Sequence, residues 1–251
     1  MKNTTAIITG ATGNIGSVIA EMASKEFSTL ILCGFKNRQK LQKLKKKLES
    51  NCTIKIFSSD ISVFYSLKGN FGKIFTPQTK INALIHTASV RSDDVLPLAE
   101  TDTKHWENTL KTNLFGTYYL MKILLPYLRK SDWARVVLLS SSVAKTGLKN
   151  GSAYAASKAG VSNLAKTLSL EEGKNGILFN TILPGPVEID DSHFDKKYNE
   201  FRKKYYAKIL NQIPLSRLAT THDVAKLTLF LASQKNSYIT GQEINISGGL
   251  I

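Results

Sequence analysis

Short apolar runs alternate with longer amphipathic stretches along the whole chain of 251 residues. The apolar runs predict strands and the amphipathic stretches predict helices, because each pattern matches the side-chain period of its element. The predicted strands lie near residues 4–9, 29–34, 53–58, 82–87, 134–140, 177–183 and 241–247. The predicted helices lie near residues 14–26, 37–49, 104–130, 152–173 and 221–233. This order predicts a doubly wound α/β fold, in which a seven-stranded parallel sheet carries helices on both faces.

Length and composition fit a single domain over residues 1–251. With 42% apolar residues the chain can bury a large core, and the sequence shows neither repeats nor a linker. No segment approaches the roughly 18 consecutive apolar residues of a membrane span, and the N-terminus lacks the features of a signal peptide. Two separate cysteines and four histidines without ligand spacing predict neither a disulfide framework nor a metal site. We therefore expect a cytoplasmic protein without a membrane segment or a metal.

The chain is strongly basic, with 34 Lys and Arg against 19 Asp and Glu and a formal net charge of +15. Such a charge attracts an acidic partner and speeds its encounter with the protein. Nucleic acid is a poor candidate, because the basic residues are spread along amphipathic helices without a recognition motif or interleaved aromatic residues. The same charge also fits a lysine- and asparagine-rich composition that serves no partner, and both interpretations stay open.

A glycine-rich turn joins the first predicted strand to the first predicted helix. A strand, a glycine turn and a helix in this order are typical of a dinucleotide-binding site. Glycines let the backbone approach a pyrophosphate, and the helix N-terminus adds N–H donors and a partial positive charge. The turn residues expected to contact the cofactor are Gly10, Thr12, Gly13, Asn14, Ile15 and Gly16.

A second stretch, residues 139–158, holds a hydroxyl, a phenol and an ammonium at spacings that chemistry can use. Tyr154 and Lys158 are four residues apart, so on a helix they share one face. A positive charge beside a phenol lowers its pKa from about 10 toward the range of a useful general acid. Ser141 ends the preceding apolar run, so its hydroxyl can face the phenol, and Ser142 is the alternative serine that strand register disfavours. Alone, the Tyr154 and Lys158 pair would also fit an ordinary helix surface pair.

Together, the glycine turn, Ser141, Tyr154 and Lys158 resemble the short-chain dehydrogenase/reductase family, and the resemblance extends from Thr4 to Leu250. It implies a Rossmann-type fold, a nicotinamide cofactor and the reduction of a carbonyl to a secondary alcohol. In this family Tyr154 would donate the proton and Ser141 would bind the same substrate oxygen. Lys158 would bind the nicotinamide ribose and lower the pKa of Tyr154.

The resemblance implies further cofactor contacts. Lys36 and Arg38 follow the second predicted strand, and with no carboxylate before Glu49 they favour the 2′-phosphate of NADP over NAD. They could instead be solvated charges at the head of a lysine-rich helix. Asp60 could contact the adenine or cap the following helix. Contacts with the cofactor are also implied for Asp60, Ile61, Ala88, Pro184, Gly185 and Val187.

Three stretches show how the chain follows or departs from the family pattern. Asn113 matches a helix asparagine whose backbone holds a water that links the active-site lysine to a proton relay. The usual Asn-Asn-Ala-Gly is replaced by His86-Thr87-Ala88-Ser89, in which only Ala88 matches. The charged and aromatic stretch 187–213 corresponds to a mobile lid over the substrate.

The glycine turn departs from the pattern as well, because the middle glycine is displaced to Gly13 and Asn14 stands in its place. Asn tolerates left-handed backbone conformations, so the turn can survive. The same turn resembles related proteins that bind NADP as sensors without catalysis. The four candidate catalytic residues, which a sensor does not need, are Asn113, Ser141, Tyr154 and Lys158.

The end of the chain, residues 213–220 and 239–249, is similar to bacterial family members that act on 3-oxoacyl groups of acyl carrier protein. We therefore expect NADPH-dependent reduction of such a group in fatty acid biosynthesis, with a small free ketone, sugar or secondary alcohol as the alternative substrate. The carrier is acidic and suits a basic surface. Residues expected near the active-site mouth are Arg129, Lys130 and Lys174, with Lys203, Lys204 and Lys208 on the lid.

The long helices predicted at 104–130 and 152–173 carry apolar residues on more than one face, whereas a core needs only one stripe. The family pairs these helices between subunits, so we expect a homotetramer of twofold symmetry. The alternative is that both helices lie deep within the fold. The apolar residues in question are Leu114, Tyr118, Leu120, Leu124, Leu125, Ala155, Val161, Leu164 and Leu168.

Overall fold

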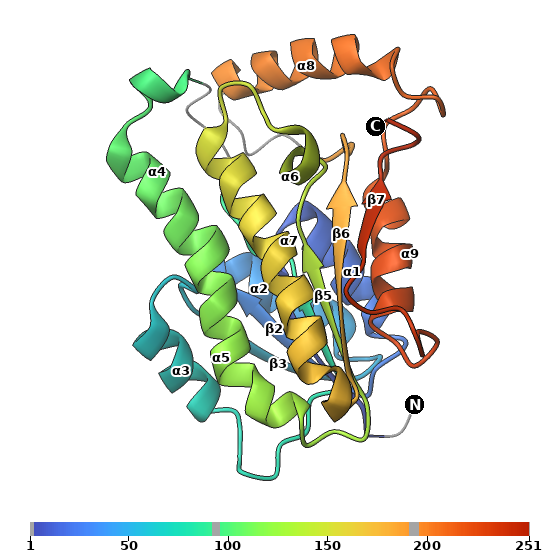
Figure 1. The fold of residues 1–251 in the computed structure, drawn as a ribbon. Coiled ribbons are helices and arrows are strands. Elements are labelled where there is room, and N and C mark those ends of the chain that lie inside the picture. The colour runs from blue at the N-terminus through green and yellow to red at the C-terminus, as the bar shows by residue number, and fades with distance from the viewer. Residues whose placement is uncertain (1–2, 92–95, 191–195, 251) are drawn as a thin grey trace.

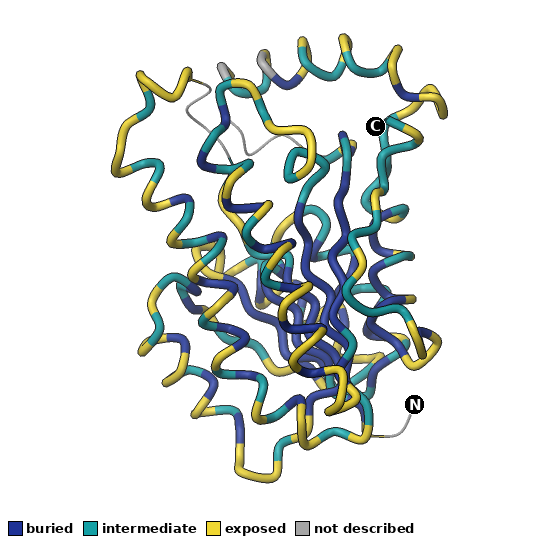
Figure 2. The backbone as a smooth tube through the Cα atoms, in the orientation of Figure 1, coloured by how far each residue is buried: buried dark blue, intermediate teal, exposed yellow. Residues whose placement is uncertain are grey.

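The computed structural model describes residues 3–91, 96–190 and 196–250. These residues form one sheet of seven parallel strands in the order β3-β2-β1-β4-β5-β6-β7. The strands are β1 (Thr5–Thr9), β2 (Thr29–Gly34), β3 (Thr53–Ser58), β4 (Ala83–His86), β5 (Ala134–Leu139), β6 (Ile177–Pro184) and β7 (Glu243–Ile246). The central strands β4 and β5 are buried along their whole length, because helices cover both faces of the sheet (Figure 2).

Two groups of helices form the outer layers of this single domain (Figure 1). One face carries α1 (Asn14–Ala23), α2 (Arg38–Leu48) and α9 (Thr221–Leu231). The other face carries α3 (Phe64–Gly72), α4 (Thr103–Leu110), α5 (Gly116–Leu128) and α7 (Ser152–Glu172). The shorter elements are η1 (Leu98–Glu100), the π-helical turn η2 (Lys111–Phe115), α6 (Val143–Thr146) and η3 (Gly173–Asn175). A further helix, α8 (Lys196–Leu210), lies across the top of Figure 1.

The predicted α/β fold is confirmed, and the ends of the observed strands differ from the predicted ends by two residues or fewer. The predicted helix 104–130 is interrupted by the π-helical turn η2. Helices α3 and α8 were not predicted from the sequence. In α3, Gly69 and Gly72 lower the helix propensity, and in α8 the residues that face inward are Tyr and Arg instead of aliphatic side chains.

Because the strands are parallel, their carboxyl ends meet at one edge of the sheet, the upper edge in Figure 1. Thr9 ends β1 directly before the glycine turn, Leu139 ends β5 just before Ser141, and Pro184 ends β6. Ligands of doubly wound sheets bind outside the carboxyl ends of the strands. The fold therefore brings the two candidate stretches of the sequence to the same place.

The part of the chain that the structure describes lacks a membrane-spanning helix, a cluster of metal ligands and a disulfide. None of its helices combines the length and the apolarity that crossing a bilayer requires. It contains no group of three His, Cys, Asp or Glu side chains that could hold a metal ion. Cys33 and Cys52 are both free thiols. The cytoplasmic location remains a prediction from the sequence.

Candidate active site

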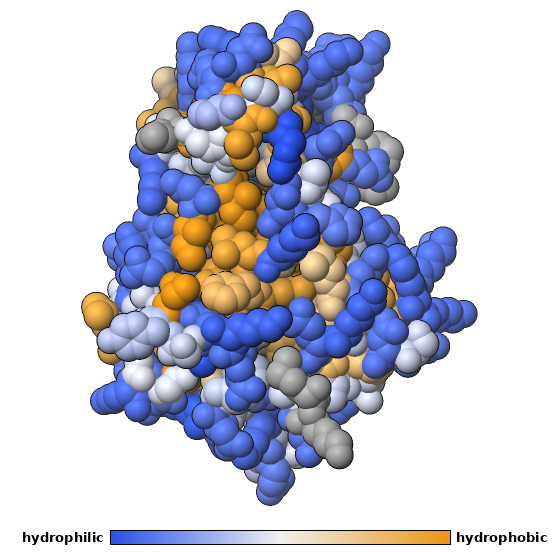
Figure 3. Space-filling model, turned by 90° about the vertical axis from the view of Figure 1, so that its right-hand side faces the viewer, coloured by the Kyte–Doolittle hydropathy of each residue, from blue (hydrophilic) through white to orange (hydrophobic). Residues whose placement is uncertain are grey.

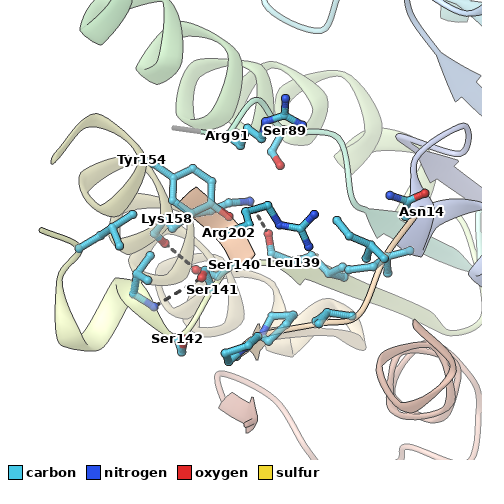
Figure 4. A pocket seen from close by; sticks show the side chains of 18 of the residues that line it. Asn14, Ser89, Arg91, Leu139, Ser140, Ser141, Ser142, Tyr154, Lys158 and Arg202 are labelled. Atoms are coloured by element: carbon cyan, nitrogen blue, oxygen red, sulfur yellow. Dashed lines mark hydrogen bonds between the residues drawn. The ribbon is translucent and has the colours of Figure 1, made fainter. Parts of the chain in front are cut away.

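A cavity of about 450 Å³ lies at the carboxyl edge of the sheet, between the ends of β5 and β6 and the helix α8. The glycine turn borders one end of this cavity, and the N-terminal part of α7 borders the other. Figure 4 shows Asn14 of the turn on one side, with Tyr154, Lys158 and Ser141 on the opposite side. The cavity therefore joins the predicted cofactor turn to the predicted catalytic side chains.

Gly10 and Gly16 are the positions in the turn where only glycine fits. Gly10 has a φ of 69°, in the left-handed region that side chains disfavour. A Cβ on Gly16 would lie 2.2 Å from the carbonyl oxygen of Gly10. Gly13 has an ordinary φ of -75°, and a Cβ there would come no closer than 3.2 Å to that oxygen. The bare backbone beside the N-terminus of α1 fits a dinucleotide pyrophosphate.

Asn14 does not need the left-handed conformation that the sequence suggested for it. It is the first residue of α1, and the described non-glycine residues with a positive φ are Asn3, Asn150 and Ser216. Its Nδ2 donates a hydrogen bond of 2.8 Å to the carbonyl oxygen of Asp190. The expected reason for Asn14 was therefore wrong. Its backbone is helical and not left-handed, and its side chain connects the turn to the segment after β6.

Ser141 is the serine that faces Tyr154. Both side chains line the cavity, the interaction with Ser141 acts to lower the pKa of Tyr154, and Ser141 Oγ accepts a hydrogen bond from the backbone N–H of Val143 at 3.4 Å. The backbone N–H of Ser142 donates to the carbonyl oxygen of Pro184 at 3.0 Å, and the side chain of Ser142 lies beyond Ser141 as seen from Tyr154 in Figure 4. The geometry favours Ser141 over Ser142 as the partner of the phenol.

Lys158 is buried one helical turn after Tyr154, with 4% of the residue exposed. Its Nζ donates a hydrogen bond of 2.9 Å to the carbonyl oxygen of Leu139 and lies 5.6 Å from the centre of the Tyr154 ring. Ser140 Oγ donates to the carbonyl oxygen of Lys158 at 2.9 Å, which fixes α7 against the end of β5. Burial disfavours the charged ammonium and lowers the pKa of Lys158 to about 8.

The predicted lowering of the Tyr154 pKa is wrong for this structure. Burial raises the pKa of Tyr154 to about 12, the hydrogen bond with Ser141 opposes this rise, and Tyr198 and Tyr206 add to it. Nζ of Lys158 is directed at the Leu139 carbonyl, so its charge does not offset the loss of solvent around the phenol. Tyr154 is therefore a neutral phenol at neutral pH, which is the form that can donate a proton.

Asn113 lies in η2 and is 1% exposed. Its Oδ1 accepts from the backbone N–H of Val90 at 2.8 Å, and its Nδ2 donates to the Val90 carbonyl at 2.9 Å and to Ser157 Oγ at 3.0 Å. Ser157 Oγ in turn donates to the carbonyl oxygen of Tyr154 at 2.8 Å. Asn113 thus connects η2 to the turn of α7 that carries Tyr154, and the water expected at its backbone remains a prediction.

The other predicted cofactor contacts follow the same edge of the sheet. Those that line the cavity are Gly13, Asn14, Ile15, Gly16, Tyr154, Lys158, Pro184, Gly185 and Val187. Those outside it are Gly10, Thr12, Lys36, Arg38, Asp60, Ile61 and Ala88. Lys36 and Arg38 are exposed just after β2, and a Cβ on Gly10 would lie 2.6 Å from the backbone nitrogen of Ala88.

Asp60 and Ile61 lie just after β3, and their side chains have structural partners. The Asp60 carboxylate accepts from the backbone N–H of Ser62 at 2.9 Å and from its hydroxyl at 2.7 Å. Asp60 thus stabilises the turn before α3, close to the capping role that the sequence left open. The side chain of Ile61 is in the core beside Gly116, so only its backbone is available to a cofactor.

A protein-family model described as "Enoyl-(Acyl carrier protein) reductase" matches residues 10–251 of the chain. The chain belongs to the short-chain dehydrogenase/reductase family. As a short-chain dehydrogenase/reductase it is an oxidoreductase that acts on a CH–OH group or its carbonyl with a nicotinamide cofactor. The glycine cradle and the cavity described above are consistent with this membership.

Relatives within the short-chain dehydrogenase/reductase family include bacterial proteins named "3-oxoacyl-[acyl-carrier-protein] reductase FabG". The protein of Buchnera aphidicola subsp. Acyrthosiphon pisum is 30% identical over 246 residues, which cover 98% of this chain and 96% of the relative. The protein of Rickettsia conorii is 32% identical over 247 residues, with 98% and 96% covered. The protein of Aquifex aeolicus is 30% identical over 253 residues, with 100% and 98% covered.

Solved structures of the short-chain dehydrogenase/reductase family share the fold. A short-chain type dehydrogenase/reductase from Mycobacterium ulcerans matches with a TM-score of 0.88 and 24% identity, covering 100% of this chain and 90% of that one. NAD+-bound xylitol dehydrogenase matches with a TM-score of 0.87 and 20% identity, covering 98% of both chains. At these identities the two structures support the fold alone.

Helix α8 supplies cavity residues that were not predicted from the sequence of this short-chain dehydrogenase/reductase. Tyr198, Arg202, Tyr205 and Tyr206 line the cavity together with Arg91. Arg91 Cζ lies 4.4 Å from the centre of the Tyr198 ring, and Arg202 Cζ lies 5.0 Å from the centre of the Tyr206 ring. The four-residue spacing of Tyr198, Arg202 and Tyr206 was the available signal, but it only indicates a shared face once a helix is predicted there.

Three of the basic residues expected near the cavity, Arg129, Lys130 and Lys174, lie elsewhere. Arg129 follows α5 and Lys174 follows α7, at the lower end of Figure 1, whereas the cavity lies at the upper end beneath α8. The Arg129 guanidinium pairs with the buried carboxylate of Glu172, and Nε donates to Oε2 at 2.8 Å. Within one chain, the expectation that Arg129, Lys130 and Lys174 flank the active-site mouth is wrong. These residues follow the C-termini of α5 and α7, at the opposite end of the sheet from the cavity.

Proposed function

We propose that this protein is an NADPH-dependent ketoreductase that converts 3-oxoacyl-[acyl-carrier-protein] to 3-hydroxyacyl-[acyl-carrier-protein] in fatty acid biosynthesis. The observation that carries the proposal is that Ser141, Tyr154 and Lys158 share one cavity with the glycine turn. A hydroxyl and a neutral phenol that line the same cavity can both donate to one carbonyl oxygen. A protein that only senses NADP has no use for this pair. The names of the bacterial relatives support the acyl substrate.

In the proposed reaction, Tyr154 donates its phenolic proton to the substrate oxygen while the carbonyl carbon is reduced. Ser141 donates a hydrogen bond to the same oxygen and stabilises the negative charge that develops there. Lys158 holds the nicotinamide ribose and keeps a positive charge beside Tyr154. NADPH, when bound, supplies the hydride. Asn113 acts through Ser157 and holds the turn of α7 that carries Tyr154.

The proposed preference for NADPH rests on the residues after β2. Lys36 and Arg38 are exposed there, and Asn37 caps α2 by accepting from the backbone N–H of Lys40 at 2.8 Å. A 2′-phosphate would meet two cations, and the sequence from Gly34 to Leu48 contains no Asp or Glu to bind a 2′-hydroxyl instead. The loop therefore favours the phosphorylated cofactor.

The proposed docking surface for the acidic carrier protein is the outer side of α8. Lys203, Lys204 and Lys208 are exposed on this helix, which covers the cavity. A carrier protein bound to this side of α8 would lie next to the cavity. In this proposal residues 187–213 form the substrate lid, of which 191–195 lie outside the described part of the chain.

The function is tested by following the oxidation of NADPH and, in parallel, of NADH. The substrates are acetoacetyl-carrier protein, acetoacetyl-CoA, crotonoyl-carrier protein and a panel of small ketones and sugars. We expect the highest kcat/KM with NADPH and acetoacetyl-carrier protein, with an advantage over acetoacetyl-CoA that shrinks as salt rises. Turnover of crotonoyl-carrier protein alone, or equal rates on free ketones at every salt concentration, would contradict the proposal.

A matched pair of variants tests the docking surface in the same assay. Reversing the charges of Lys203, Lys204 and Lys208 to Glu should remove the carrier advantage and leave the rate with acetoacetyl-CoA unchanged. Reversing Lys45, Lys46 and Lys47 at the end of α2 alters the net charge equally at a distance from the cavity. If both triple variants behave alike, the effect is one of overall charge and the α8 surface is not the docking site.

We also propose a homotetramer of twofold symmetry, which only part of the residue set suggested by the sequence supports. Leu120, Leu124, Val161 and Leu168 are buried inside the chain itself and cannot face a partner. Leu114, Leu125, Ala155 and Leu164 are partly buried, and Tyr118 is 45% exposed. Phe115 of η2, at 49%, and Leu170 of α7, at 85%, add further exposed apolar surface. A tetramer of this symmetry needs a second interface. Figure 3 shows apolar side chains gathered in a hollow on the side that carries α9, below α8.

Light scattering tests the assembly directly. The wild-type protein should have the mass of four chains at micromolar concentration, and Phe115→Glu with Tyr118→Glu should lower it. Tyr65→Glu is the control, because Tyr65 is 83% exposed on α3. A monomeric wild type at that concentration would rule out the tetramer.

A further inference from the structure

A chain of hydrogen bonds runs from the glycine turn to η2 through a buried histidine. His86 ends β4 and is 2% exposed. Its Nδ1 lies 2.6 Å from Thr9 Oγ1, and its Nε2 lies 2.9 Å from Thr117 Oγ1. Thr117 Oγ1 donates a hydrogen bond of 2.5 Å to the carbonyl oxygen of Asn113. Since Thr9 directly precedes Gly10, the chain links the cofactor turn to the helix turn that holds Asn113.

The direction of each bond follows from counting hydrogens. A threonine hydroxyl carries one hydrogen, and that of Thr117 goes to the Asn113 carbonyl, which can only accept. Thr117 Oγ1 must then accept from His86, so Nε2 carries the ring hydrogen. Nδ1 is left as an acceptor, and Thr9 donates to it. These contacts fix the ring as the neutral Nε2–H tautomer.

The surroundings of His86 oppose any second proton on the ring. A proton on Nδ1 would turn the acceptor for Thr9 into a donor. Burial lowers the pKa of His86 to about 3, and the charge of Lys158 adds to this lowering. The histidine is thus suited to a fixed hydrogen-bonding role and unsuited to exchanging protons with the substrate.

We propose that His86 is a positioning residue, which through Thr117 holds the carbonyl of Asn113, and with it η2, in place relative to the glycine turn. This inference rests on the proposed function, because Asn113 bonds to Ser157, which bonds to the carbonyl of Tyr154. The hydrogen-bond chain then couples the place where the cofactor binds to the place where the proton is donated. Residues outside the cavity would in this way set the alignment of Tyr154 with its substrate.

Thr117→Val tests the inference, because valine keeps the shape of threonine and removes the hydroxyl. We expect kcat to fall about tenfold, the rate equivalent of one lost buried hydrogen bond, while KM and the affinity for NADPH stay within twofold of wild type. Thr117→Ser keeps a hydroxyl and should restore kcat.

Thr228→Val is the matched control for a purely structural effect. Thr228 is 0% exposed, and its Oγ1 donates to the carbonyl oxygen of Val224 at 2.8 Å, the same four-residue helix contact in α9. Both valine variants should lose similar thermal stability, but Thr228→Val should keep the wild-type kcat. Equal kcat values in the two valine variants would overturn the inference.

A double-mutant cycle tests whether His86 and Thr117 act together. His86→Asn and Thr117→Val should each lower kcat, and the double variant should lose no more than the worse single variant, as expected for one shared chain of bonds. Independent losses that multiply in the double variant would overturn the inference.

The tautomer of His86 provides a readout that does not depend on activity. In 15N NMR spectra, with the His86 signals assigned by their loss in His86→Asn, Nε2 should carry the hydrogen at neutral pH and Nδ1 should not. An Nδ1–H tautomer or an imidazolium would overturn the inference even if the enzyme is active. A wild type with the expected tautomer that reduces no carbonyl substrate would instead overturn the proposed function and leave the hydrogen-bond chain standing.

Discussion

Tyr154→Phe is expected to lower kcat by about 10²–10⁴-fold, the usual contribution of a positioned general acid. Tyr154 and Ser141 both line the cavity, and the raised pKa of Tyr154 keeps its proton in place at neutral pH. Phenylalanine keeps the ring and its packing, so the loss should fall on the chemical step. The affinity for NADPH, measured by fluorescence titration, should change little because the glycine turn is not touched.

The control for this substitution is Tyr127→Phe, which also removes one phenolic hydroxyl. Tyr127 packs on Phe75 with ring centres 4.7 Å apart and does not line the cavity, so its variant should keep the wild-type rate. A Tyr154→Phe enzyme with near-normal turnover would show that another group donates the proton. Stopped-flow measurement of single turnovers separates this loss from any change in product release.

Gly16→Ala is expected to lower the affinity for NADPH by about 10–100-fold or more, since overpacking a tight site costs about 1–3 kcal/mol. The new Cβ would lie 2.2 Å from the Gly10 carbonyl oxygen and 2.8 Å from Thr87 Oγ1, so the backbone of the turn must move. In the proposed function, that backbone is the surface that approaches the pyrophosphate. Titration with NADPH measures the loss, and thermal unfolding with and without NADPH separates it from a loss of stability.

Gly13→Ala is the matched control, because it adds the same methyl group in the same turn. Its φ of -75° suits any residue, and the nearest atom to a new Cβ would be 3.2 Å away. Its affinity for NADPH should therefore stay within a few-fold of wild type. If both alanine variants bind NADPH equally well, the crowding at Gly16 does not control the cofactor site.

The sequence revealed the sheet and the carboxyl edge because both depend on local patterns. Buried parallel strands appear as short apolar runs, and the residues that follow them, such as Gly10 and Ser141, must then gather at one edge. The pairing of Tyr154 with Lys158 followed from their four-residue spacing on α7. These parts of the site need no knowledge of long-range packing.

Other parts of the site depend on tertiary surroundings that no local pattern records. The balance between burial and charge at Tyr154 is set by residues from α8, the end of β5 and α7 itself, so the direction of its pKa shift was predicted wrongly. The inward face of α8 consists of Tyr198, Arg202 and Tyr206, which do not produce the apolar periodicity of an ordinary helix. The pairing of Arg129 with Glu172 joins helices far apart in the sequence.

The π-helical turn η2 adds one residue to the helical path between α4 and α5 compared with a continuous α-helix. One additional residue rotates everything that follows by about 100° around the helix axis. Leu120, Leu124 and Leu128 of α5 are fully buried with this rotation in place. A relative without the turn could therefore be aligned with this chain only through a one-residue gap inside a helix, and that gap would fall beside Asn113.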